Sequence, residues 1–132
     1  MTVTNLIFGI LAVWLVAWQV RPIFGVRRIT AAALRARLRQ NPSLRVVDVR
    51  TEDEWAQGHI EGSLSIPLGR LRAEVHRLSP EDDVVLVCRT GYRAMQAFHI
   101  LRRRKFQRLW VLQGGMVAWM QEMAAGPAPS MD

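Results

Sequence analysis

Apolar positions after residue 30 follow two alternating spacings. Short runs rich in valine, isoleucine and leucine predict strands over Leu44–Val49, Ser63–Ile66, Val84–Val87 and Leu109–Leu112. Between them, apolar residues recur at three- and four-residue intervals, which predicts helices over residues 31–40, 52–57, 68–78, 94–104 and 114–123. Strands that alternate with helices predict an α/β fold, with a mainly parallel sheet covered by helices on both faces.

Residues at the predicted helix ends agree with this reading. Thr30 and Thr51 are suitable N-caps, and the helix after Thr51 carries three acidic residues in its first turn, Glu52–Glu54. Asn41-Pro42 ends the first helix and Gly58 ends the second. The soluble part is therefore divided into short elements, as expected for one α/β domain.

The amino-terminal segment has a different pattern. No charged residue precedes Arg21, and Leu6–Trp18 contains no polar side chain. A membrane-spanning helix needs about 20 mostly apolar residues, so Val3–Val20 is predicted to be a transmembrane helix. A secretory signal peptide would need a basic start and a small-residue cleavage site, and neither is evident. A buried core helix is the other alternative, but a small α/β domain seldom hides a helix that is apolar all round.

The charges that follow this segment predict its orientation. Six arginines come before any acidic residue: Arg21, Arg27, Arg28, Arg35, Arg37 and Arg39. The positive-inside rule places such a flank in the cytoplasm. We therefore expect a single-pass protein of the cell (inner) membrane with its catalytic domain in the cytoplasm and the lipid bilayer as a partner.

Composition further limits the classes of protein to which this chain can belong. A chain of 132 residues fits one domain with an appendage, and a single cysteine excludes an intramolecular disulfide framework. The net charge of +7 suggests nucleic acid, but the basic residues are dispersed and no recognised nucleic-acid module appears. The histidines lack metal-site spacing, and His59, between Gly58 and Ile60, is expected to stabilise a turn. No nucleotide, metal or flavin motif is present, so no cofactor is predicted.

The one cysteine, Cys88, lies where a thiolate would be favoured. It follows the strand Val84–Val87 and begins a loop that ends at Arg93, before the next helix. Unpaired backbone N–H groups and the positive end of a helix dipole stabilise an anion at such a junction. Arg89 and Arg93 add positive charge, and Gly91 allows the loop to fold back so that its amides point inward.

An alternative for Cys88 is inert packing, because free cysteine is among the most buried residue types. Arg89 and Arg93, taken singly, can also be solvated loop charges. The two arginines and Gly91 together around one thiol favour a reactive site.

These residues resemble the single-domain rhodaneses, which carry sulfur as a cysteine persulfide. The loop Cys88-Arg89-Thr90-Gly91-Tyr92-Arg93 matches the family's active-site pattern of Cys-Arg, a fourth-position glycine and a basic or hydroxylated end. Three further segments resemble the family's signatures in the same order: Val46–Trp55, Gly58–Pro67 and Val111–Trp119. The resemblance covers about Arg27 to Met123.

The resemblance implies a rhodanese-like domain over residues 30–124. Residues 1–20 are then the transmembrane anchor, residues 21–29 a basic juxtamembrane linker and residues 125–132 a flexible tail.

The resemblance also implies a chemistry. Cys88 would take a sulfur atom from a small anionic donor such as thiosulfate, or from a persulfide, and pass it to a thiol, protein thiol or cyanide. Loop amides from Arg89 to Arg93 would stabilise the persulfide, with Thr90 and Gly91 in the cradle, while the two arginines hold the donor and Tyr92 shapes the mouth. Asp48 and Arg50 are assigned to supporting structure.

Two rival functions remain at this point. A phosphatase or arsenate reductase uses a similar cysteine cradle, although the related phosphatases have one more residue between cysteine and arginine than this chain has. A non-catalytic membrane module that recruits partners is the second, although many such relatives lack the cysteine that this chain retains.

Overall fold

The computed structural model describes residues 2–24 and 26–126, with side chains described for 2–19 and 26–126. Its centre is a five-stranded parallel sheet with the strand order β1-β5-β4-β2-β3. The strands are β1 (Arg28–Ile29), β2 (Arg45–Asp48), β3 (Leu64–Ser65), β4 (Val84–Val87) and β5 (Leu109–Leu112). The predicted α/β class and parallel sheet are confirmed.

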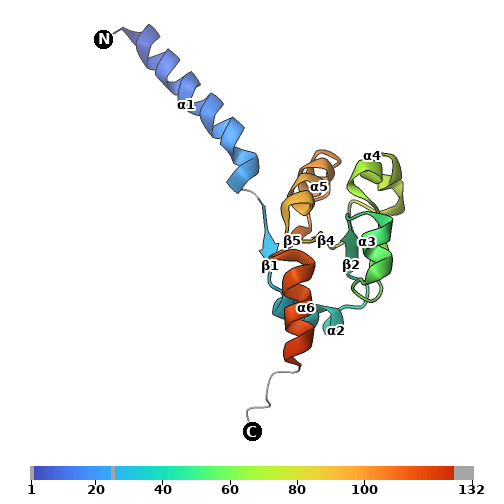
Figure 1. Ribbon diagram of the computed structural model, residues 1–132. Coiled ribbons are helices and arrows are strands. Elements are labelled where there is room, and N and C mark those ends of the chain that lie inside the picture. The colour runs from blue at the N-terminus through green and yellow to red at the C-terminus, as the bar shows by residue number, and fades with distance from the viewer. Residues whose placement is uncertain (1, 25, 127–132) are drawn as a thin grey trace.

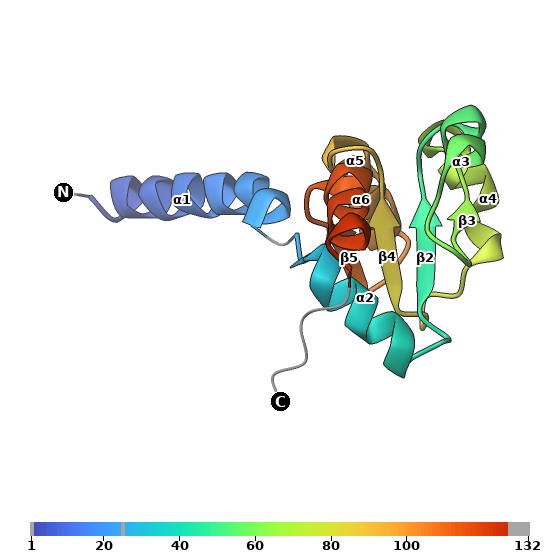
Figure 2. The same ribbon diagram turned by 60° about the horizontal axis from the view of Figure 1, so that its bottom comes forward.

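Helices cover both faces of this sheet (Figures 1 and 2). One face carries α2 (Ala31–Gln40) and α6 (Gly115–Ala125), and the other carries α4 (Leu71–Glu74) and α5 (Tyr92–Arg103). The short helix α3 (Glu52–Gln57) follows β2, and 3-10 turns η1 (Leu68–Arg70) and η2 (Val75–Arg77) flank α4.

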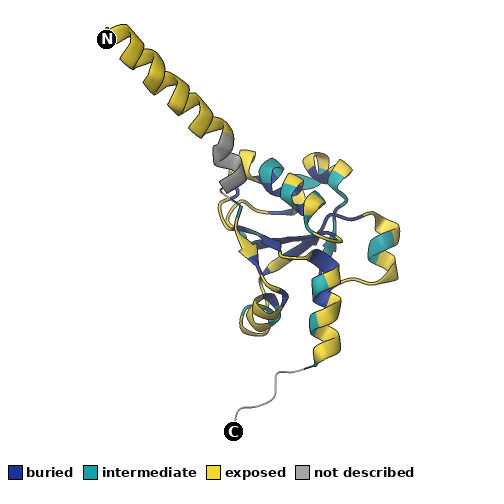
Figure 3. Ribbon diagram, turned by 60° about the vertical axis from the view of Figure 1, so that its left-hand side comes forward, coloured by how far each residue is buried: buried dark blue, intermediate teal, exposed yellow. Residues whose placement is uncertain are grey.

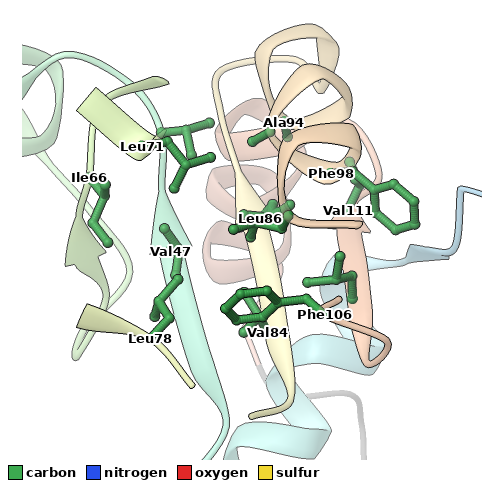
Figure 4. Close-up of a cluster of buried hydrophobic side chains, with 14 of the residues drawn as sticks. Val47, Ile66, Leu71, Leu78, Val84, Leu86, Ala94, Phe98, Phe106 and Val111 are labelled. Atoms are coloured by element: carbon green, nitrogen blue, oxygen red, sulfur yellow. The ribbon is translucent and has the colours of Figure 1, made fainter. Parts of the chain in front are cut away.

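Strand β4 divides the core between these two faces. Val84, Leu86 and Cys88 lie on the face beneath α4 and α5, where Figure 4 shows Leu86 among side chains from the neighbouring strands and helices. Val85 and Val87 face α2 and α6. This alternation follows from the two-residue period of a strand. It fixes the direction of Cys88 as the next residue in the series.

Three elements differ from the sequence prediction. The stretch predicted as a juxtamembrane linker contains β1, which is too short to show an apolar alternation. The predicted helix over 68–78 is divided into η1, α4 and η2, and the three-residue spacings from Leu68 to Leu71 and from Val75 to Leu78 also fit the 3-10 period. The helix α5 begins at Tyr92, so Tyr92 and Arg93 form its first turn and not the end of a loop.

The amino-terminal helix α1 (Val3–Phe24) extends away from the domain in Figure 1. Its large apolar side chains from Val3 to Trp18 are 52–73% exposed, and Figure 3 shows this length of the helix as exposed. Within the described part of the chain, no helix is both long enough and apolar enough to cross a membrane. The predicted transmembrane span is therefore not supported. Most of the predicted flexible tail lies outside the described residues.

Candidate active site

Cys88 directly follows β4 as a buried thiol within a backbone cradle. Its residue surface is 1% exposed, and the Gly91 N–H donates a hydrogen bond to Sγ at 2.9 Å. Gly91 has a φ of +118°, a conformation that side-chain-bearing residues rarely adopt. This turn allows the amide to approach the sulfur. The predicted inward fold of the loop at Gly91 is present.

The base of the loop is held by the beginning of α6. The Met116 N–H donates to the Cys88 carbonyl at 2.8 Å, and the Val117 N–H donates to the Arg89 carbonyl at 3.2 Å. Gly115 makes this approach possible, since a Cβ there would lie 2.4 Å from the Cys88 oxygen. Two helices therefore meet at the loop: α5 continues from it and α6 fixes its carbonyls.

Arg93 was predicted to hold the anionic donor, and the structure gives it a bound partner. Its two terminal nitrogens contact the Glu54 carboxylate at 2.8 and 3.0 Å. This hydrogen-bonded pair lowers the pKa of Glu54 to about 2. It also raises the pKa of Arg93, with smaller contributions from the charges of Cys88 and Asp48. Arg93 thus lies near the thiol with its charge balanced by Glu54.

The other predicted loop residues lie toward solvent. Arg89 and Thr90 are exposed, and the Tyr92 side chain is 71% exposed. Arg89 forms no ion pair among the described residues. Its guanidinium is therefore the loop cation left without a protein counter-ion in that part of the chain.

Asp48 and Arg50 form a buried pair beside the site. The Arg50 Nε and terminal nitrogen donate to the Asp48 carboxylate at 2.8–3.1 Å, and the same terminal nitrogen donates to the Gly58 carbonyl at 2.7 Å. Asp48 is opposite Val87 in the β2–β4 register, one residue before Cys88. The pair joins the end of β2 to the turn after α3, which fits the supporting role predicted for it.

The turn after α3 also contains His59. Its ring stacks on Trp55 with a centroid distance of 3.7 Å, and its Nδ1 lies 2.8 Å from the Trp55 carbonyl. Trp55 in turn donates to the Ser63 hydroxyl at 3.0 Å. These contacts place His59 in the turn, as the sequence predicted.

A hollow of about 270 Å³ adjoins the tip of the loop at Thr90 and Gly91. It lies between the loop tip, the first turn of α5, the end of β5 and the edge strand β1. Its lining residues are Arg28, Thr90, Gly91, Tyr92, Met95, Val111, Leu112, Gln113 and Gly114. A larger hollow of about 710 Å³ lies along α1 alone and contains none of the predicted site residues.

Sequence reasoning did not assign Glu54 or Arg28 to the site. Glu54 pairs with a residue 39 positions away, and Arg28 reaches the loop only through the pairing of β1 with β5. No local spacing signals either contact. The position of Glu54 beside Trp55, inside a segment that resembles a family signature, was the available hint.

This arrangement suits covalent chemistry on sulfur. The Gly91 N–H and the positive charge of Arg93 are placed to stabilise an anionic group at the end of β4. The neighbouring exposed Arg89 can attract an anionic reactant. Such a cysteine can act as a nucleophile and hold a covalent intermediate.

Comparisons with known proteins agree with this geometry. Residues 30–122 match the family described as the rhodanese-like domain. A protein of Allochromatium vinosum named "Sulfurtransferase" is 34% identical over 94 residues, which cover 71% of this chain and 88% of that protein.

Solved structures give the same result. A rhodanese-related protein from Thermoplasma volcanium has a TM-score of 0.64 and 29% identity, over 73% of this chain and 92% of that one. A rhodanese-like domain protein from Staphylococcus aureus has a TM-score of 0.68 and 26% identity, over 71% and 91%. The chain belongs to the rhodanese-like domain family.

Proposed function

We propose that this protein is a sulfurtransferase that carries sulfane sulfur as a persulfide on Cys88. The observation that carries the proposal is the cradle itself, in which the Gly91 amide lies 2.9 Å from the sulfur of the sole cysteine. The similarity to a protein named as a sulfurtransferase supports it.

The first half-reaction loads the cysteine. The Cys88 thiolate attacks the outer sulfur of a donor such as thiosulfate, a new S–S bond forms, and the electrons of the donor's S–S bond leave with sulfite. Exposed Arg89 attracts the anionic donor to the loop. Arg93 supports this step from the side: its bond to Glu54 fixes the start of α5, and its charge favours the neighbouring anion.

The second half-reaction removes the sulfur from Cys88. An acceptor thiolate or cyanide attacks the outer sulfur of the persulfide, and the Cys88 thiolate leaves. The Gly91 N–H is suited to stabilise the anion in both steps, in the manner of an oxyanion hole. Because the two reactants bind in sequence to different forms of Cys88, the kinetics should be ping-pong.

Steady-state assays test this proposal. Thiosulfate and cyanide should yield sulfite and thiocyanate with parallel reciprocal plots, and Cys88→Ser should abolish the product. An aryl phosphate should release no phosphate. Rapid phosphate release with no thiocyanate would instead favour the oxyanion phosphatase.

We also propose that α1 attaches the protein to the inner membrane, with the catalytic domain on the cytoplasmic side. Two observations support attachment: the large apolar side chains from Val3 to Trp18 are more than half exposed (Figure 3), and α1 extends away from the domain (Figure 1). Exposed apolar surface of this extent marks an interaction site. No described helix is both long enough and apolar enough to cross a membrane. The test of attachment therefore also measures how deeply α1 inserts.

Fewer arginines support the cytoplasmic orientation of the domain than the sequence alone suggests. Arg35 lies 3.7 Å from Glu122, and the guanidinium of Arg37 lies over the Trp110 ring at 5.0 Å. Both arginines therefore have partners inside the domain. The orientation then depends mainly on the residues nearest α1, among them Arg27 and Arg28.

Fractionation tests the attachment and its depth. We expect full-length protein to stay with membranes through a high-salt wash, and a variant lacking residues 1–24 to be released with its sulfur transfer intact. Resistance to alkaline carbonate would indicate deep insertion. Recovery of the full-length protein in the salt-washed supernatant would contradict attachment, and protease access only from the outer side would contradict the orientation.

A further inference from the structure

The hollow beside the loop has a chemical character of its own. Its nine lining residues include one cation, Arg28, and no carboxylate. Met95 supplies apolar surface, while Thr90 and Gln113 supply polar groups. A volume of about 270 Å³ lies just below the usual range for small-molecule sites, about 300–1,000 Å³. The hollow therefore suits a small organic anion.

Strand pairing fixes Arg28 at this position. Its Cα lies opposite Val111 in the β1–β5 register, and its terminal nitrogen lies 3.8 Å from the Met95 sulfur. The side chain thus faces α5, whose first turn continues from the loop. Arg28 is exposed and forms no ion pair among the described residues, so its charge is available to a ligand.

We propose that this hollow is the subsite for the sulfur acceptor, and that it selects small thiols that carry a carboxylate. The carboxylate pairs with Arg28, the carbon chain lies against Met95, and the thiolate is directed to the loop tip at Gly91. This rests on the proposed sulfur transfer. Thiosulfate and cyanide are compact ions without a carbon chain, so contact with the apolar Met95 side chain would add little to their binding.

The transfer balances with such an acceptor. The acceptor thiolate attacks the outer sulfur of the Cys88 persulfide and forms a new S–S bond. The electrons of the bond to Cys88 remain on its sulfur as a thiolate, and the product is the acceptor persulfide. No oxidant, reductant or further reactant is needed.

Two thiols of similar size test the subsite: 3-mercaptopropionate, which carries a carboxylate, and 2-mercaptoethanol, which is neutral. Arg28→Gln should raise the KM for the anionic thiol about five- to tenfold more than the KM for the neutral one, as expected for loss of one charge-assisted pair. Arg28→Lys should recover most of the difference. Arg27→Gln is the matched control, because it removes the same charge one residue earlier, outside the hollow, and should not alter the ratio.

A binding measurement separates this inference from the proposed function. NMR titration of sulfur-free protein with 3-mercaptopropionate should shift the Gly91 and Gly114 amide signals to saturation, at about five- to tenfold higher concentration in Arg28→Gln. Binding without sulfur transfer would overturn the proposed function and with it the acceptor role of the hollow, while the contact of Arg28 with the carboxylate would stand. Unaltered titration in Arg28→Gln, or an equal KM change for both thiols, would overturn the subsite.

Discussion

Arg93 and Glu54 are joined by two hydrogen bonds, at 2.8 and 3.0 Å, that tie the first turn of α5 to α3. The carboxylate also accepts from the Thr51 N–H and hydroxyl in the capping box of α3. One side chain therefore fixes both the start of α3 and the first turn of α5, which follows the Cys88 loop. The loop geometry depends on a residue that precedes it by 34 positions in the chain.

Replacing this carboxylate should loosen both elements. Glu54→Gln removes the charge-assisted pair and should lower the free energy of unfolding by about 1 kcal/mol, since the pair is bidentate but partly exposed. Denaturant unfolding measures the change. Glu52→Gln is the control, because Glu52 pairs with Arg70 at the exposed surface, and its loss should have a much smaller effect. Equal losses in the two variants would contradict the role of Glu54.

The same pair predicts a dependence on pH. The pKa of Glu54 is lowered from 4.5 to about 2, first by its hydrogen bond to Arg93. A lowered folded-state pKa gives stability that is complete above the unfolded value and is lost as the pH falls through the folded one. The stability difference between wild type and Glu54→Gln should therefore be constant above about pH 5 and shrink toward pH 2. A difference that grows with acid would contradict the assignment.

Gly91 should be needed for the chemistry as well as for the fold. Gly91→Ala forces a side chain into a φ of +118° and should cost about 1–3 kcal/mol or displace the amide from Sγ. Gly62→Ala is a matched control, since Gly62 has a φ of +82° in a turn before β3, at the opposite end of the sheet. Both variants should lose stability in thermal unfolding. Only Gly91→Ala should lose most of the rate of sulfur loading.

Gly115 provides a second test of the loop. Gly115→Ala places a Cβ 2.4 Å from the Cys88 oxygen and 2.5 Å from the Arg89 oxygen, so the base of the loop must move away from α6. We expect at least a tenfold fall in kcat/KM for thiosulfate, because small misplacements of reacting groups are costly. Gly69→Ala, where a Cβ meets no atom within 4 Å, should behave as wild type. Full activity in Gly115→Ala would show that the α6 contact is dispensable.

Local patterns predicted much of this fold. The bounds of α2, β4 and β5 match the prediction, because each element has a cap or an apolar run that ends sharply. The position of Cys88 at the end of β4 followed from the same run. The edge strand β1 was missed because two residues carry no periodicity, and its pairing with β5 places Arg28 beside the loop.

The features of the site that could not be predicted from the sequence depend on contacts between residues far apart in the chain. From the local sequence, the positive charge of Arg93 indicates a residue that binds an anionic substrate. Only the folded chain brings Glu54 to it as a partner. The hollow beside Gly91 is likewise assembled from β1, β5 and the loop, which are distant in the chain. Charge and spacing located the candidate nucleophile, Cys88, whereas tertiary pairing decided which arginines lack an ion-pair partner among the described residues.

The mass of the intact protein after thiosulfate treatment tests the central claim most directly. Because Cys88 is the sole cysteine, a persulfide has one place to form. We predict a gain of one sulfur atom that disappears on adding cyanide, with release of thiocyanate, and no gain in Cys88→Ser. Wild-type protein that gains no sulfur, or Cys88→Ser protein that gains it equally, would contradict the account.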